Sequence, residues 1–125
     1  MNIELGKLQG AWNIIALEVE GAKMAEHVFK GSKIVVNSSS FNTISMGASY
    51  KGSVVIDERS VPKKLDLMFT EGPHMGQSAR AIYELDGDVW KICMGFAGRD
   101  RPLAFVTIAG SGHALETLVR EAGGR

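Results

Sequence analysis

Three histidines and a single cysteine are the side chains of this 125-residue sequence best suited to metal binding or nucleophilic chemistry. His27, His74 and His113 lie far apart, and none belongs to a His-x-His, His-Glu-x-x-His or Cys-x-x-Cys spacing. Cys93 lies in an apolar segment with no adjacent cation that would lower its pKa, so we expect a buried, unreactive thiol. The sequence therefore predicts no metal site and no cofactor, and it disfavours nucleophilic catalysis.

An arginine-rich loop offers a different chemistry, the binding of an anion. Arg99 and Arg101 flank Asp100, and Pro102 follows them. We interpret this cluster first as a salt bridge that fixes the loop, and alternatively as a clamp for a carboxylate, because the planar guanidinium forms paired hydrogen bonds with carboxylate oxygens. His74 lies in another loop, bounded by glycines, and is the histidine best placed to contact a ligand, since binding residues concentrate on loops.

Methionine and aromatic side chains form a third candidate group, suited to holding an apolar ligand. Such side chains fill irregular cores by default, and they also line adaptable pockets. They are Met46, Met68, Met75, Met94, Phe69, Phe96 and Tyr83. Tyr83 is expected to share a strand face with the small residues Ala79 and Ala81, so that its hydroxyl is a natural polar contact for a ligand. The candidate ligand-binding residues are thus Tyr83, Arg101, Arg99, His74, Phe69 and Met94.

Composition limits the partners of the protein. Fourteen Lys plus Arg balance fourteen Asp plus Glu without a basic run, which argues against nucleic acid. No apolar stretch approaches the ~20 residues that span a membrane, and the first residues lack the basic-then-apolar order of a secretory signal. One cysteine permits no internal disulfide, as is typical of a reducing compartment. We expect a cytoplasmic protein with one domain, residues 1–125.

Segments with the composition of β-strands alternate with Gly- and Ser-containing turns along the chain. They are 12–20, 32–37, 41–46, 49–57, 64–70, 78–85, 89–94 and 113–120, the last being compatible with a helix as well. The best helical fragment, at 22–30, is barely two turns long, and an extended apolar segment covers 103–108. The Asp86-Gly87 pair between two strand-like segments is the strongest hairpin signal in the chain.

This succession of about eight strands favours a closed barrel. Segments such as 14–17 and 54–56 are apolar at consecutive positions, and an open sheet would expose such strands at an edge. We expect the remaining outer apolar residues to be covered by the short helix, by 103–108, or by a second subunit. The predicted fold class is all-β, an antiparallel up-and-down barrel of about eight strands with one short helix.

Several short motifs resemble those of lipocalin-like proteins, whose first strand carries Gly-x-Trp. Gly10-Ala11-Trp12 occupies that position here. More narrowly, the chain resembles a small lipocalin-like (calycin-type) domain family of mostly uncharacterised bacterial proteins, abundant in planctomycetes. The matching segments follow the family's order over nearly the whole chain: 8–12, 62–67, 81–88, 101–102 with Phe105, and 118–120. The resemblance implies a lipocalin-like barrel and transfers no activity, because a fold does not determine a function.

The resemblance also implies how the barrel is closed. In lipocalins the Gly-x-Trp tryptophan seals one end, and an arginine of the last strand lies against it. The matching positions here are Trp12 and Arg120. A guanidinium over an indole face contributes about 0.5–2 kcal/mol. A ligand is then expected to enter from the opposite end of the barrel, where the hairpin and Gly-rich loops gather.

Three classes of function fit these features. The favoured one is a barrel that binds a small apolar or amphipathic molecule, with Tyr83 and Arg101 orienting it. The second is a cofactor-independent isomerase, cyclase or lyase in which Tyr83, His74 or an arginine moves a proton. The third is a filled barrel that serves as a homodimeric structural or interaction module. A cavity separates the first two from the third, and a titratable pair within hydrogen-bond reach separates the enzyme from the binder.

Overall fold

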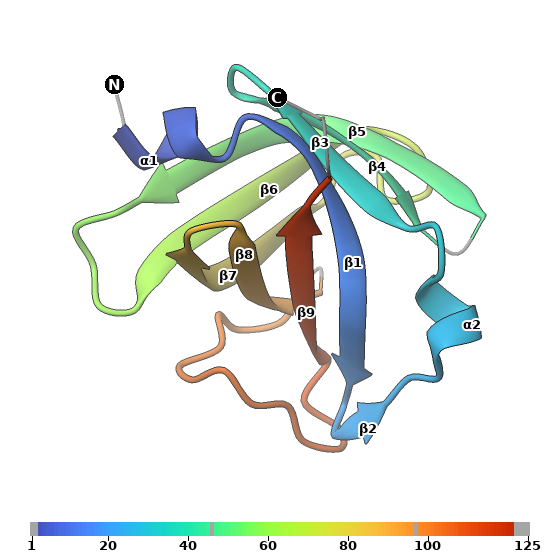
Figure 1. Ribbon diagram of the computed structural model, residues 1–125. Helices are drawn as coiled ribbons and strands as arrows, with labels where there is room; N and C mark the ends of the chain where they lie inside the picture. Colours follow the sequence, from blue (N-terminus) through green and yellow to red (C-terminus); the bar gives the residue numbers. More distant parts are fainter. Residues whose placement is uncertain (1–2, 46, 97, 122–125) are drawn as a thin grey trace.

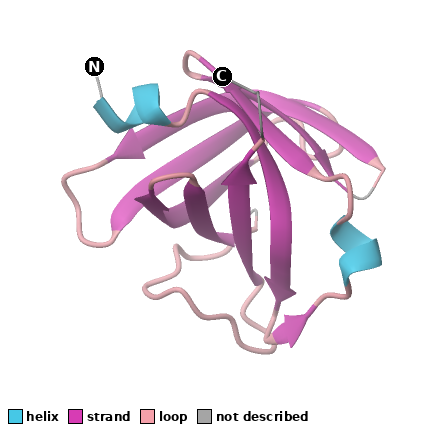
Figure 2. Cartoon of the chain, viewed as in Figure 1, coloured by secondary structure: helices cyan, strands magenta, loops and turns pink. Residues whose placement is uncertain are grey.

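Eight strands close into an antiparallel barrel (Figure 1). The computed structural model describes residues 3–45, 47–96 and 98–121. Within these residues, nine strands form one sheet in the order β2-β1-β3-β4-β5-β6-β7-β8-β9, and β9 also pairs with β1. Two short helices lie outside the sheet (Figure 2), and in these ranges no helix is long and apolar enough to cross a lipid bilayer. The structure confirms the predicted all-β, up-and-down, lipocalin-like barrel.

The elements follow the predicted segments closely. The strands are β1 (Gly10–Val19), β2 (Ala22–Lys23), β3 (Lys33–Asn37), β4 (Ser40–Ser45), β5 (Ala48–Asp57), β6 (Lys63–Glu71), β7 (Ser78–Asp86), β8 (Val89–Gly95) and β9 (His113–Arg120). The helices are α1 (Ile3–Lys7) and α2 (Glu26–Phe29). The segment at 113–120, compatible with strand or helix, is strand β9. The helical fragment expected at 22–30 is shorter, because β2 takes its first two residues as a partner of β1.

Pairing between β9 and β1 closes the barrel, and the two strands lie side by side in Figure 1. The pairing includes Trp12 opposite Arg120, and its register shifts between Ile14 and Ala16. A bulge of this kind moves the inward-outward alternation by one residue. It explains why the buried residues of the apolar run, Ile14 and Leu17, are three positions apart with exposed residues between them.

The hairpin predicted from Asp86-Gly87 joins β7 to β8. Asp86 pairs with Val89, so the connection consists of Gly87 and Asp88. Gly87 has a φ of 59°, the left-handed conformation that tight hairpin turns require. The turn signal was therefore correct, with the strand extending one residue further than predicted. Its expected place at the open end was wrong, because Asp88 of the turn pairs with Arg120 at the closed end, 3.0 Å from its Nε atom.

The apolar segment at 103–108 is irregular and covers part of the outer face of β8. Cys93 points outward from the barrel, is fully buried, and has its Sγ atom 3.7 Å from the carbonyl oxygen of Val106. Burial raises the pKa of this thiol. The hydroxyl of Thr107 accepts a hydrogen bond from the backbone N–H of Gly21 at 2.8 Å, which fastens the segment to the turn after β1.

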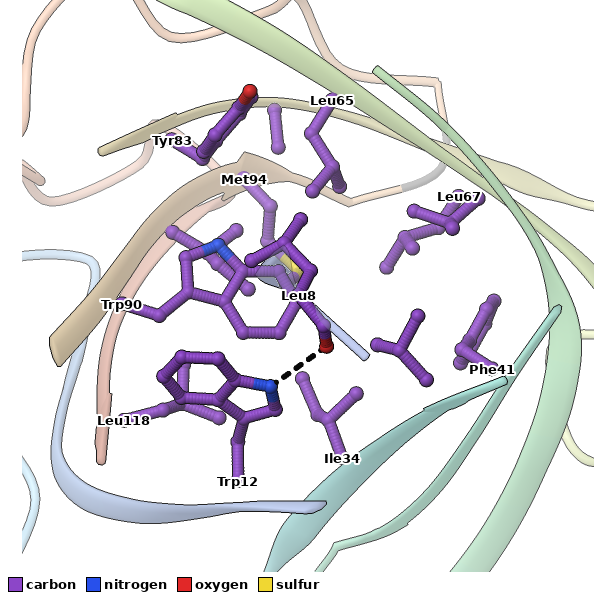
Figure 3. Packing of buried hydrophobic residues seen from close by; sticks show 14 of the residues in the cluster. Leu8, Trp12, Ile34, Phe41, Leu65, Leu67, Tyr83, Trp90, Met94 and Leu118 are labelled. Carbon is purple, nitrogen blue, oxygen red and sulfur yellow. Dashed lines mark hydrogen bonds between the residues drawn. The ribbon is translucent and has the colours of Figure 1, made fainter. Parts of the chain in front are cut away.

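Two tryptophans form the floor of the barrel (Figure 3). The rings of Trp12 and Trp90 meet edge to face with centroids 5.3 Å apart, and Trp12 Nε1 donates a hydrogen bond to the carbonyl oxygen of Leu8 at 2.9 Å. The guanidinium carbon of Arg120 lies 4.2 Å from the centroid of the Trp12 ring. Arg120 also donates to the carbonyl oxygen of Gln9 at 2.9 Å. The structure thus brings together the two residues assigned to barrel closure.

Helix α1 covers this closed end, so the structure has two short helices where the sequence analysis expects one. Glu4 of α1 accepts a hydrogen bond from the Tyr83 hydroxyl at 2.7 Å and pairs with Lys63. Leu8, directly after the helix, is fully buried. A helix of five residues is too short to be stable by itself, so tertiary contacts hold it and local sequence does not predict it.

Trp12→Ala is expected to lower the free energy of unfolding by about 3–5 kcal/mol, the range for removing a buried aromatic side chain. Val55→Ala is the control, because Val55 is 65% exposed on β5 and its truncation is expected to cost less than about 1 kcal/mol. Urea denaturation followed by circular dichroism measures both. A Trp12→Ala protein as stable as the wild type would contradict the assignment of the barrel floor.

Candidate functional site

A cavity of about 290 Å³ lies inside the barrel, with Trp90 of the floor among its walls. All eight barrel strands contribute to the walls, which are mainly apolar. The lining residues are Leu17, Val19, Ile34, Val36, Phe41, Thr43, Ser45, Tyr50, Val54, Leu65, Leu67, Phe69, His74, Gln77, Ala79, Trp90, Ile92, Met94, Phe96, Ala114 and Glu116. The volume is roughly twice the ~150 Å³ of an engineered apolar cavity that binds benzene.

Small residues at inward positions leave this space. Ala79 of β7 and Ala114 of β9 line the cavity directly. Gly52 of β5 has no side chain, and this allows the ring of Phe41 to pack directly against the backbone of β5. A Cβ atom at Gly52 would be 2.7 Å from a ring carbon of Phe41 and 1.9 Å from the carbonyl oxygen of Met68. The shape of the cavity therefore depends on residues that carry almost no side chain.

Aromatic rings gather around His74 on one wall. The imidazole stacks on Tyr50 with ring centroids 5.3 Å apart and an interplanar angle of 24°. Phe69 meets His74 edge to face at 5.5 Å. The loop that carries His74 folds back on β5, where a Cβ atom at Gly72 would be 2.5 Å from the carbonyl oxygen of Ser49. The histidine is therefore held on the cavity wall by ring packing.

Glu116 is the one acidic side chain among the described residues that line the cavity. It lies in the middle of β9, opposite Leu17 of β1 and Ile92 of β8. Its Oε1 atom is buried and has no hydrogen-bond partner within the described ranges. Burial raises the pKa of this carboxyl to about 7. The cavity thus contains an acid that changes its charge near neutral pH.

Sequence reasoning missed Glu116, although one signal pointed to it. The alternation of Leu115, Thr117 and Val119 draws attention to the face of β9 that is not the cavity face. The register in which β9 pairs with β1 determines which face of β9 points into the barrel. If Arg120 must reach Trp12, residues of the same parity on β9, including Glu116, face inward.

Three of the six candidate ligand-binding residues line the cavity, namely Phe69, His74 and Met94. Tyr83 does not, because it lies at the closed end of the barrel. Its hydroxyl donates to Glu4, and in Figure 3 it points away from Trp90. Burial and then the contact with Glu4 raise the pKa of Tyr83.

Arg99 and Arg101 are outside the cavity. Arg101 Nη1 donates to the carbonyl oxygen of Ala81 at 2.7 Å and lies 2.8 Å from Asp66 Oδ1 on β6. Arg99 is exposed. The loop is therefore held by an ion pair between Arg101 and Asp66 of β6, and the expected pairing with Asp100 is not formed among the described residues.

The other soft side chains of the sequence analysis are divided between the cavity and the surface. Phe96 lines the cavity. Met68 and Met75 are 48% and 68% exposed. Met46 lies outside the described residues.

Fold and site together define a closed antiparallel barrel with an apolar interior cavity, whose described lining includes one acid, Glu116. Among the described residues, no group of three or more His, Cys, Asp or Glu side chains could hold a metal ion. Comparisons with models of protein families, with curated proteins and with solved structures found no match.

Glu116→Gln is expected to remove a pH dependence of stability between about pH 5 and 7. The folded protein keeps a proton that the unfolded chain, with a carboxyl pKa near 4.5, releases. The wild-type free energy of unfolding should therefore fall as pH rises through this window, by about 3 kcal/mol in total, and level off above it. The amide cannot lose a proton, so its curve lacks this fall.

Urea denaturation at a series of pH values measures the effect as the difference between wild type and variant. Glu84→Gln provides the matched control, since Glu84 is exposed on β7 and its replacement should leave the wild-type curve unchanged. Parallel curves for wild type and Glu116→Gln would contradict the burial of this carboxyl.

Proposed function

We propose that this protein binds a small apolar or amphipathic molecule inside its barrel. The observation that carries the proposal is the cavity of about 290 Å³, lined mainly by aliphatic and aromatic side chains. Ligand sites in proteins are typically concave, mostly apolar and supplied with a few polar groups. Trp12 and Trp90 pack across one end, so the ligand would enter from the other end, where the wall that carries His74 lies.

We further propose that the chain belongs with the lipocalin-like, calycin-type proteins that it resembles. The ordered motifs support this assignment, and so does the contact between Arg120 and Trp12 at the closed end. In a barrel of this size the interior either is filled by side chains or holds one small ligand. The cavity favours ligand binding over the alternative of a filled, homodimeric interaction module.

A cofactor-independent isomerase, cyclase or lyase is the second candidate. The observation in its favour is Glu116, an acid in the cavity with a pKa of about 7, which suits general acid–base catalysis. An enzyme of this kind is expected to pair such a group with a second titratable residue. Among the described residues, Glu116 Oε1 has no hydrogen-bond partner, so the simple binder is better supported.

Ala114→Phe is expected to weaken ligand binding, because the new ring would occupy part of the cavity. N-phenyl-1-naphthylamine, a neutral apolar dye, is the test ligand, and its fluorescence in a titration reports the dissociation constant. We expect saturable binding to the wild type and a loss of affinity of about tenfold or more in the variant, as for a site that is partly filled.

Ala16→Phe is the matched control, since Ala16 is exposed on β1 and the same substitution there leaves the cavity unchanged. Circular dichroism checks that both variants are folded. Unsaturable binding to the wild type, or equal affinity in both variants, would contradict a ligand site inside the barrel.

A further inference from the structure

The described walls of the cavity include one carboxyl group, that of Glu116, and no basic side chain of lysine or arginine to pair with it. Glu116 Oε1 is buried without a hydrogen-bond partner in the described ranges, and none of the described lining residues is Lys or Arg. An ionised carboxylate in an apolar interior is costly unless a cation or several hydrogen-bond donors pair with it. The described lining supplies no cation for the ionised form of this carboxyl, so a cationic ligand is the partner that suits it.

We propose that the ligand of this barrel is a small lipophilic amine, whose protonated nitrogen pairs with the Glu116 carboxylate while its hydrocarbon or aromatic part fills the cavity. This inference rests on the proposed function and specifies the chemical class of the ligand. A volume of about 290 Å³ suits a short alkyl chain or one or two rings.

The placement of the arginines argues against an acidic ligand. Arg101 is engaged on the outside of the barrel by Asp66 and a backbone carbonyl, and Arg99 is exposed. A carboxylate ligand would meet only the like charge of Glu116 within the lining. An alcohol would supply one hydrogen bond and leave the carboxylate charge uncompensated, whereas an ammonium group supplies both donors and charge.

Aromatic rings in the lining add to the preference for a cation. The faces of aromatic rings attract ammonium groups, most strongly where water is excluded. The rings in the lining are those of Phe41, Tyr50, Phe69, Trp90 and Phe96, together with the imidazole of His74. The cavity therefore offers a negative centre surrounded by electron-rich surfaces.

An ion pair between the ammonium group and the Glu116 carboxylate also makes the affinity for the amine depend on pH. Leu17 of β1 and Ile92 of β8 are the residues opposite Glu116, and the other titratable side chains in the described lining are Tyr50 and His74. An ammonium group binds the ionised carboxylate, and alkylamines stay protonated to about pH 10. Amine affinity should therefore rise as Glu116 loses its proton between about pH 5 and 8.

Three unbranched eight-carbon molecules that differ in their head group test the proposal: octylamine, octan-1-ol and octanoate. Isothermal titration calorimetry at about pH 8 should show octylamine binding about tenfold or more tightly than the other two, the size of a charge-assisted hydrogen bond. Glu116→Gln should abolish this preference by weakening octylamine binding and should change octan-1-ol binding less than about twofold. Glu84→Gln, at an exposed position on β7, should behave as the wild type.

Octylamine affinity should also fall in the wild type from about pH 8 to 5, and the fall should be smaller in Glu116→Gln. Any effect of His74 is common to both proteins, so the difference between them isolates Glu116. Equal or tighter binding of octanoate or octan-1-ol would overturn the proposal, as would an unchanged octylamine affinity in Glu116→Gln.

The two proposals fail in different ways. If N-phenyl-1-naphthylamine binds inside the barrel and octylamine shows no preference, the amine assignment is wrong and the ligand-binding function stands. If neither the dye nor any of the octyl compounds binds, both proposals are wrong.

Discussion

The pairing of β9 with β1 is the constraint on which the rest of this structure depends. It joins the first and last strands of the barrel, and its register places Arg120 against the ring of Trp12. Because side chains alternate along a strand, the same register turns Glu116 toward the interior. The alignment of β9 with β1 therefore has two consequences. It forms the contact between Arg120 and Trp12 that closes the floor, and it places Glu116 in the cavity.

Two features of the interior lower the stability of the folded protein. A cavity forfeits the dispersion contacts that a filled core would make. The Glu116 carboxyl, whose Oε1 atom is buried without a hydrogen-bond partner among the described residues, costs desolvation free energy, and this burial raises its pKa. Proteins tend to depart from well-packed, fully hydrogen-bonded interiors at functional sites. Both departures occur at the same cavity, which supports the proposal that it binds a ligand.

The fold could be predicted from the sequence because its signals are local. Turn residues separate the strands, and the Asp86-Gly87 pair marks a hairpin. The site could not be predicted as well, because it depends on non-local geometry. The paths of the loops take Arg101 to the outer face of the barrel, and contacts across the barrel hold both α1 and Tyr83 at the closed end. Glu116 was missed because only the closure register reveals which face of β9 is inward.

Crystallographic analysis of the protein under xenon pressure tests the central claim most directly, because xenon occupies apolar cavities inside proteins. The account predicts a closed barrel with β9 hydrogen-bonded to β1 and xenon density inside it, in contact with lining residues such as Trp90, Ile92 and Met94. A barrel interior filled by side chains, without xenon density, would contradict it.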